Sequence, residues 1–553
     1  MLGMILASSL MLQSDQIRVC QVGYLPQETK FAMVVAMTGQ SAVIKDARTD
    51  KAVGTFPVGF AVSDPSTGDL VRPVDFSAVK TPGAYYLEIE GVGKSYTFRI
   101  AKDVFAPVYR IAMRSYLGQR CGVDVSMAPD FPEYNYKACH LADAEFHASS
   151  GKTGTRKCVG GWHDAGDFGR YIVNCGITMG TLLWTYELYE PKIRGIGLAL
   201  PDSKKGVPDI LTEIKWNLDW MLTMQDDDGG VWHKATTANF PGFILPVDDK
   251  APMLIVGTGT APYKNTTATG DFAAVCAIAS RVYRRFDRGY SDKCLASAER
   301  AWSWLAQNPS VRYGRNPQGI NTGGYGDSNT ADEVLWAAAE LYRTTGKKLY
   351  HDYFLANYKK WTPTVDGAKA QGWPELANMA MYTYALSGRK DVDPKAVEAI
   401  RADSIKAADD IVERVQGNAY RIPLKVDEYY WGSNAVVANY AMMLFIARKF
   451  QDKPSYLNGA MDMVHYLFGR NTFNTSYVTH VGSKYAMNPH HRPSAADKVT
   501  KPWPGLIVGG PNADRRTSPP PARQWQDVAA SYTTNETAIN WNAPLVFVLA
   551  GSL

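Results

Sequence analysis

The change in hydrophobic periodicity near residue 101 is the feature that most constrains the fold of this chain. Before that point, short β-rich runs alternate with turn signals such as Thr81-Pro82-Gly83. Several short strands within about 85 residues are typical of an immunoglobulin-like β-sandwich. We therefore predict this sandwich over residues 16–102, with strands at Ile17–Gln21, Phe31–Ala36, Ser41–Asp46, Val71–Phe76 and Ala84–Ile89.

Beyond residue 101 the chain consists of long segments with helical period, separated by long loops rich in Gly, Asp and aromatic residues. With flanking helices the number of such segments approaches a dozen, which fits two concentric rings of six helices. We predict an (α/α)6 barrel over residues 106–553, with helices that include Ile177–Leu188, Asp209–Met224, Phe272–Phe286, Ala331–Thr344, Asn378–Leu386, Lys406–Val415, Asn434–Phe450 and Tyr456–Phe468. Long loops on a regular scaffold usually carry function.

The composition describes a folded multidomain protein. The chain has 553 residues, 46% hydrophobic and 20% charged, with a net charge of only +5 and both signs interspersed. Nothing in this balance favours nucleic acid or a membrane surface as a partner. Residues 1–15 are interpreted as a signal remnant or a disordered terminus, because Met1–Leu12 is apolar but lacks a basic start and a cleavage site. On that basis we predict a secreted or periplasmic protein.

Three carboxylates in two distant, glycine- and asparagine-rich segments indicate the chemistry. Gly160–Asp167 reads Gly-Gly-Trp-His-Asp-Ala-Gly-Asp, and Asn535–Pro544 reads Asn-Glu-Thr-Ala-Ile-Asn-Trp-Asn-Ala-Pro. Hydrolysis of a glycosidic bond needs one carboxylic acid to protonate the leaving oxygen and one carboxylate on the opposite side of the sugar. Asp164 and Asp167 could grip one water between them, as an inverting hydrolase requires.

Each of these acids also has a purely structural interpretation. Asp164 and Asp167 could form an Asx-turn that caps the following helix. Thr533-x-x-Glu536 could be a capping box at the start of the last helix.

These two segments resemble glycoside hydrolase family 9, the inverting cellulases. A third block, Ser476-Tyr-Val-Thr-His-Val-Gly-Ser-Lys484 followed by Pro489-His490-His491-Arg492, matches the family's His-x-Arg signature, and Trp525-Gln-Asp527, Tyr532 and Glu536 fall at the family's intervals. The resemblance covers about residues 105 to 553. The N-terminal sandwich is similar to the immunoglobulin-like module of one subgroup.

The resemblance implies a role for each matching residue. Asp167 would be the general base, Asp164 would hold the attacking water, and Glu536 would be the general acid with a raised pKa. His490 and Arg492 would bind the sugar on the non-reducing side of the cleaved bond, although Arg492 could equally be a structural ion-pair partner. Asp527 would support the site from behind.

Aromatic residues near the matched segments are candidates for sugar stacking. Trp431, next to Tyr430, falls where the family often places a sugar-stacking tryptophan, and Trp541 lies five residues after Glu536. Looser candidates are Trp232, Tyr325 and Trp373. Core packing explains any one of these rings equally well.

Cys121, Cys139, His140 and His163 form a candidate zinc site, because two thiolates and two imidazoles are a tetrahedral zinc set. Scattered buried core residues are the alternative. Cys139 and His140 are adjacent, however, and His163 directly precedes Asp164. The set is also similar to a structural zinc site of the sandwich-bearing subgroup, which implies an ion that pins the loop of Asp164 and Asp167.

A calcium loop is the second predicted metal site. Residues Ser328 to Glu333 resemble the family's calcium loop, where hard oxygen ligands gather at a helix start. The candidate ligands are Ser328, Asp332 and Glu333, with Glu375 completing the set. An acidic N-terminal cap on the helix that begins near Asp332 is the alternative.

The resulting functional prediction is an inverting endo-β-1,4-glucanase acting as a monomer on cellulose-type glucans. Asn434-Ala435 stands where some relatives place an arginine for distant subsites, and no carbohydrate-binding module follows residue 553. Both features favour soluble glucans or short oligosaccharides. The alternatives are an exo-acting β-glucosidase or exo-β-glucosaminidase, a non-catalytic glycan-binding relative, or a hydrolase with catalytic zinc, which would need an open position that four protein ligands would close.

Overall fold

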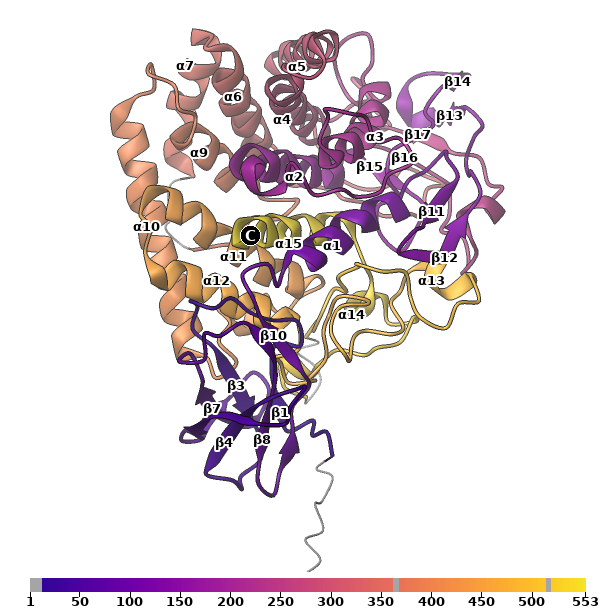
Figure 1. Cartoon of the computed structure of the whole chain (residues 1–553). Coiled ribbons are helices and arrows are strands. Elements are labelled where there is room, and N and C mark those ends of the chain that lie inside the picture. The colour runs from indigo at the N-terminus through magenta and orange to yellow at the C-terminus, as the bar shows by residue number, and fades with distance from the viewer. Residues whose placement is uncertain (1–11, 362–367, 514–518) are drawn as a thin grey trace, which may run out of the picture.

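The computed structural model describes residues 12–361, 368–513 and 519–553. The apolar start of the chain, on which the signal interpretation depends, lies almost wholly outside the described residues. The N-terminal strands form a separate body below the larger helical part, and the C-terminus ends in a helix at the centre of the molecule (Figure 1).

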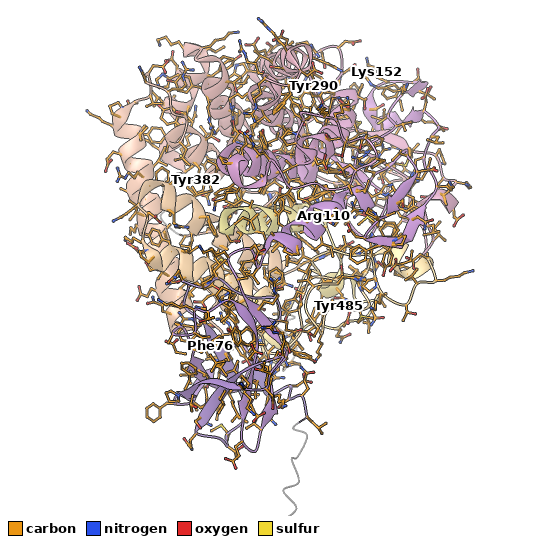
Figure 2. The ribbon with its side chains drawn as sticks, viewed as in Figure 1. Phe76, Arg110, Lys152, Tyr290, Tyr382 and Tyr485 are labelled. Atoms are coloured by element: carbon orange, nitrogen blue, oxygen red, sulfur yellow. The ribbon has the colours of Figure 1, made fainter. Side chains whose placement is uncertain are left out.

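The N-terminal domain is the predicted immunoglobulin-like sandwich. One sheet has the strand order β1-β3-β7-β6 and the other has the order β2-β10-β8-β4-β5, with β9 beside β8. Tyr24 and Phe98 meet edge to face at 5.2 Å in the core, and Tyr24 meets Phe76 at 5.1 Å. Figure 2 labels Phe76 among the side chains of this domain. The strands are β1 Ile17–Arg18, β2 Gly23–Tyr24, β3 Phe31–Val34, β4 Ser41–Asp46, β5 Ala52–Pro57, β6 Val62–Asp64, β7 Asp69–Asp75, β8 Gly83–Ile89, β9 Gly93–Lys94 and β10 Phe98–Ile100.

The second domain, which follows the sandwich, is built from helices that alternate between an inner and an outer position. The inner helices are almost wholly buried, as expected of helices that are apolar all round. In this ring α15 packs on α11 and α2, and α2, α4, α6 and α9 follow in order. The inner helices are α2 Ile172–Ile193, α4 Thr266–Tyr283, α6 Ala331–Thr345, α9 Ala377–Ala385, α11 Ser433–Phe450 and α15 Ile539–Ser552.

The outer helices each present one buried and one solvated face, which is the usual pattern for the surface of a helical domain. They are α1 Ala106–Gly118, α3 Asp209–Thr223, α5 Arg288–Gln307, α7 Lys348–Asn357, α10 Pro394–Gly417 and α12 Pro454–Leu467. Inner and outer helices alternate along the described part of the chain, six of each, which confirms the predicted (α/α)6 architecture.

All the helices predicted from periodicity are present, but α1, α5, α7 and α15 were not placed. The interior of α15 contains Pro544, which argues against a helix when only the sequence is read. A second set of short strands was also missed because most have only two or three residues. These are β11 Val125–Met127, β12 Phe131–Tyr136, β13 Ala144–Phe146, β14 Thr155–Arg156, β15 Arg170–Tyr171, β16 Lys234–Thr236 and β17 Leu254–Val256.

The sandwich and the helical domain share one hydrophobic core that runs from Ile17 to Ala550. Gln21 spans the boundary. Its amide nitrogen donates to the carbonyl of Asn474 at 2.9 Å, and its amide oxygen accepts from the backbone N–H groups of Ser483 and Lys484 at 2.9 and 2.8 Å. In the described part of the chain, no helix is long and apolar enough to cross a membrane.

Candidate active site

The first carboxylate segment is a buried tight turn between β14 and β15. Gly160 and Gly161 adopt positive φ angles of 105° and 81°, which are open to glycine. A side chain at Gly161 would also collide with the ring of Trp220, 2.8 Å away. Asp164 follows this turn and is buried, with Oδ1 accepting from Asn174 Nδ2 at 2.6 Å and Oδ2 accepting from Tyr325 Oη at 2.5 Å.

Asp167 is buried at the far side of the same turn. Its Oδ2 accepts from the backbone N–H of Gly169 and from Tyr171 Oη, both at 3.0 Å. The hydrogen bond from Gly169 is the Asx-turn that the sequence allowed. However, α2 begins at Ile172 with Tyr171 as its N-cap, so Asp167 does not cap a helix.

Glu536 lies in extended backbone between two helices. It follows α14 (Tyr532–Asn535) and precedes α15, which begins at Ile539, so the capping-box interpretation is wrong. The carbonyl of Glu536 accepts from Gly509 N at 2.8 Å, and the carbonyl of Asn535 accepts from His490 N at 2.8 Å. Two neighbouring segments therefore fix the backbone on either side of a half-buried carboxyl group.

The turn and the Glu536 segment are directly connected. The carbonyl of Asp164 accepts from Ile539 N at 2.9 Å. A Cβ on Gly166 would lie 2.2 Å from the carbonyl oxygen of His490, so the turn and the His490 segment can approach this closely only because residue 166 is glycine. About 370 residues of sequence separate the two segments, and the closed helical domain brings them together.

Burial and mutual repulsion perturb the acids of the site. Burial, and then the charge of Asp167, raises the pKa of Asp164 to about 8. Burial raises the pKa of Glu536 well above the usual carboxyl range, and the charges of Asp167 and Asp164 raise it further. A buried carboxyl group with a raised pKa can hold its proton near neutral pH, as the acid of bond hydrolysis must.

His490 and Arg492 reach the site by different contacts. His490 Nδ1 pairs with the carbonyl of Ala529 at 2.6 Å, which leaves Nε2 as the free ring nitrogen. Arg492 donates from Nη1 to the carbonyl of Gly166 at 2.7 Å and from Nε to the carbonyl of Pro241 at 2.9 Å. Backbone carbonyls are thus the recorded partners of Arg492, which disfavours the ion-pair interpretation.

Asp527 accepts hydrogen bonds from the backbone before His490 and from the residue before Glu536. Its carboxylate accepts from Met487 N at 2.7 Å, from Asn488 N at 2.8 Å and from the side chain of Asn535 at 3.0 Å. It therefore locks the segment before His490 to the residue before Glu536.

The predicted aromatic residues divide into exposed and packed rings. Tyr430 and Trp431 are exposed, and the ring of Trp431 lies 5.4 Å from that of Tyr532. Trp541 packs against Gly432, whose Cβ would lie 2.8 Å from the indole. Trp232 is fully buried and donates to the carbonyl of Ser150, so this looser candidate belongs to the core.

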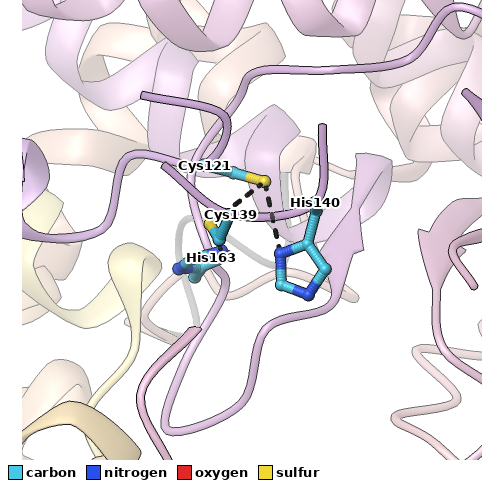
Figure 3. Close-up of side chains that lie close together, drawn as sticks. All are labelled: Cys121, Cys139, His140 and His163. Carbon is cyan, nitrogen blue, oxygen red and sulfur yellow. Dashed lines mark hydrogen bonds between the residues drawn. The ribbon is translucent and has the colours of Figure 1, made fainter. Parts of the chain in front are cut away.

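The cysteine and histidine candidates come together in one buried cluster (Figure 3). Cys121 Sγ lies 3.8 Å from His140 Nδ1 and 4.0 Å from Cys139 Sγ, and Cys139 Sγ lies 3.7 Å from His163 Nε2. A tetrahedral ion with metal–sulfur bonds of about 2.3 Å would hold its ligand atoms roughly 3.5 to 3.8 Å apart. The four donors can therefore hold a metal ion.

This cluster is tied to the carboxylate turn through Gln119. The carbonyl of Gln119 accepts from His163 N at 2.7 Å, and its side-chain amide donates to the carbonyl of Ala165 at 3.1 Å. On the other side, Asp249 Oδ2 lies 3.4 Å from His140 Nε2. A carboxylate on the second ring nitrogen is the usual support of a metal-binding histidine.

The predicted calcium ligands are not gathered in this way. Among the described residues, the Cys/His cluster is the one whose ligand atoms all come within 4.8 Å of one another. Asp332 and Glu333 are buried, but Asp332 Oδ2 accepts from Leu376 N at 2.7 Å. Glu375 is partly exposed and pairs with Lys369, and Ser328 is exposed. Asp332 Oδ1 and both carboxylate oxygens of Glu333 have no hydrogen-bond partner among the described residues, so calcium at these two residues stays a prediction.

Several residues at the site had no signal that could have selected them. Asn174 and Tyr171 reach the two aspartates from the start of α2, and Phe240 and Phe243 approach Arg492 from the segment between β16 and β17. These contacts join segments far apart in the chain, so neither a motif nor a period records them. Tyr325, a looser aromatic candidate, proves to be a hydrogen-bond donor to Asp164.

Comparisons with known proteins agree with this geometry. Residues 105–549 match the family described as glycosyl hydrolase family 9, and residues 12–94 match the cellulase N-terminal ig-like domain. Endoglucanase D of Acetivibrio thermocellus is 37% identical over 539 residues, covering 97% of this chain and 83% of that protein. The xyloglucan-specific endo-beta-1,4-glucanase BoGH9A of Bacteroides ovatus is 34% identical and covers 99% of this chain and 95% of that protein.

Among solved structures, a Zn-binding triple mutant of the GH family 9 endoglucanase J30 matches with a TM-score of 0.87 and 32% identity, covering 95% of this chain and 99% of that one. The fold and these matches define the class of protein, a glycoside hydrolase of the cellulase type. The chain belongs to glycosyl hydrolase family 9, in the group that carries an N-terminal immunoglobulin-like domain.

Proposed function

We propose that this chain hydrolyses internal β-1,4-glucosidic bonds of cellulose-type glucans with inversion at the anomeric carbon. The observation that carries the proposal is the meeting of the Asp164–Asp167 turn with Glu536, whose pKa is raised by burial and by both aspartates. The curated relatives named endoglucanase support the substrate class.

Each carboxyl group has one task in the proposed reaction. Glu536 protonates the glycosidic oxygen as the bond to the anomeric carbon breaks, and Asp167 takes a proton from the water that attacks the opposite face. Asp164 fixes that water and is itself oriented by Asn174 and Tyr325. His490 presents its free ring nitrogen to a sugar hydroxyl, and exposed Trp431 offers an apolar face to a pyranose ring.

Proton NMR of the anomeric signals during hydrolysis of short β-1,4-gluco-oligosaccharides tests this proposal. We expect the α-anomer to appear first, and Glu536→Gln and Asp167→Asn to lose at least about a thousandfold in turnover. Asp248→Asn, which removes an exposed carboxylate from the neighbouring segment, is the matched control and should retain full activity. A first-formed β-anomer, or activity in both variants, would contradict the assignment. Product lengths from the same samples separate internal from terminal cleavage.

We further propose that the Cys121, Cys139, His140 and His163 cluster holds zinc in a structural role. The donor set and the Gln119 link to the turn support this role, since a closed shell of four protein ligands offers no position for substrate. Elemental analysis of the purified protein should give one zinc per chain, and Cys139→Ser should lose it. Calcium at Asp332 and Glu333 stays a prediction that the same elemental analysis tests.

The remaining proposals concern the setting of the enzyme. A polymeric glucan is cleaved where the polymer is, so we propose that the protein acts outside the cytoplasm, and fractionation of producing cells would test this. A monomer should give a mass of 60.9 kDa by light scattering.

A further inference from the structure

Two phenylalanine rings stand partly exposed beside the candidate active site. Phe240 and Phe243 belong to the segment that joins β16 to β17, and they are 46% and 45% exposed. Burial of a phenyl side chain is favourable, so two half-exposed rings three residues apart leave apolar surface in water at a cost in free energy. Neighbouring exposed rings of this kind mark a surface that receives another apolar surface.

Arg492 holds both rings in place. Its Nε donates to the carbonyl of Pro241 at 2.9 Å, between the two phenylalanines in sequence. The guanidinium carbon lies 5.5 Å from the centre of the Phe240 ring and 5.9 Å from that of Phe243, within the range of a cation–π contact. Since Arg492 Nη1 also donates to the carbonyl of Gly166, the same side chain ties the rings to the carboxylate turn.

His490 continues the row of rings toward the other end of the site. Its ring meets Phe243 at 5.2 Å with an interplanar angle of 74°, and it lies 6.0 Å from the ring of Tyr532. Tyr532 in turn contacts Trp431. Exposed aromatic rings therefore extend from both sides of His490, whose backbone is bonded to the residue that precedes Glu536.

We propose that Phe240 and Phe243 form a sugar-binding platform that receives a glucose ring of the β-glucan, in the same row of rings as Trp431. The pyranose ring of a β-glucan carries its hydroxyls at the equator and C–H groups on both faces, so its faces are apolar and pack on aromatic rings. This inference rests on the proposed function. It adds a binding position whose residues come from a segment with no catalytic group.

Binding measurements on full-length Glu536→Gln protein, which should bind glucan without cleaving it, test the platform. Calorimetric titration with cellohexaose should show a dissociation constant about tenfold higher for the added pair Phe240→Ala and Phe243→Ala. The matched control is Phe60→Ala, which removes a 95% exposed ring from the sandwich and should leave the constant unchanged. The pair Phe240→Leu and Phe243→Leu keeps apolar bulk against Arg492 and His490 without a flat face, and should also weaken binding.

The outcomes separate this inference from the proposed function. If the Glu536→Gln parent binds no β-glucan, the proposed function is refuted and the platform with it. If the parent binds but both phenylalanine pairs bind within twofold of it, the function stands and the platform is refuted. A melting temperature of the leucine pair equal to that of the parent shows that any loss of affinity is not a loss of fold.

Discussion

Replacing Asp69 tests whether the sandwich stabilises the helical domain. Asp69 begins β7 of the sandwich and is buried where the two domains meet. Its Oδ2 accepts from Arg18 Nη1 at 2.8 Å, from Thr472 Oγ1 at 3.0 Å and from the hydroxyl of Tyr420, and Oδ1 pairs with Arg523. Three of these four partners belong to the helical domain, namely Tyr420 after α10, Thr472 after α12, and Arg523, so one carboxylate joins both domains.

The cost of Asp69→Ala follows from what is left behind. Arg18 is buried, and burial lowers its pKa to about 10 even beside Asp69, so it stays charged at neutral pH. Removing one partner of a buried ion pair costs about 3–5 kcal/mol, because the remaining charge is uncompensated. Tyr420 and Thr472 also lose an acceptor, while the half-exposed Arg523 adds little. We therefore expect a loss of about 3–5 kcal/mol in the free energy of unfolding.

The tryptophan distribution supplies the assay. All 14 tryptophans lie beyond residue 160, so their fluorescence reports unfolding of the helical domain alone. Asp69→Ala should lower the urea midpoint of this signal, and Glu90→Gln, which removes an exposed carboxylate from the sandwich, should not. Adding Arg18→Met to Asp69→Ala should restore more than half of the loss, because no buried charge is then left unpaired and only the half-exposed Arg523 lacks its partner. If the free energy of unfolding obtained from this fluorescence signal for Asp69→Ala lies within about 0.5 kcal/mol of the parent value, the view that the sandwich supports the helical domain is refuted.

Three further predictions concern the active site. Tyr325→Phe removes the hydrogen bond from the tyrosine hydroxyl to Asp164 and should lower kcat about tenfold. The control Tyr290→Phe, on outer helix α5, removes a hydrogen bond to Asp219 and should leave kcat unchanged. Equal kcat values for the two variants would show that Tyr325 has no part in the mechanism. Chelation of the bound metal should lower the melting temperature while activity persists at temperatures below it, and instant reversible loss of turnover would instead indicate a catalytic ion. The pKa of Glu536 is raised in the folded state, so the folded protein binds this proton more tightly than the unfolded chain does. The resulting contribution to the free energy of unfolding is fully present below the unfolded pKa of about 4.3 and is lost as the pH rises through the folded pKa. Calorimetry should therefore find Glu536→Gln as stable as the parent near pH 4 and more stable at pH 8, and an equal difference at both pH values would contradict the raised pKa.

The sequence predicted the parts of the fold that repeat and the residues that stand in motifs. Helices α6 and α11 were placed to within one residue at each end. The short strands β13 to β17 were missed because two or three residues cannot establish an alternation. At Glu536 a structural feature was allowed by the sequence but is absent from the structure: the local pattern fits a capping box, whereas the backbone there is extended. Tertiary contacts to Gly509 and His490 decide its conformation, and these are not local.

The Cys/His cluster and the candidate sugar-binding residues form one framework, which explains why a metal that touches no substrate would stabilise the site. His163 leads directly into Asp164, and Gln119 ties the same part of the cluster to Ala165. On the opposite side, Asp249 links His140 to the segment that carries Phe243. Arg492 connects these two parts, because its guanidinium donates hydrogen bonds to the carbonyl of Gly166 in the turn and to the carbonyl of Pro241. An ion that fixes His140 and His163 would therefore fix the turn of Asp164 and Asp167 and the segment of Phe243 relative to each other.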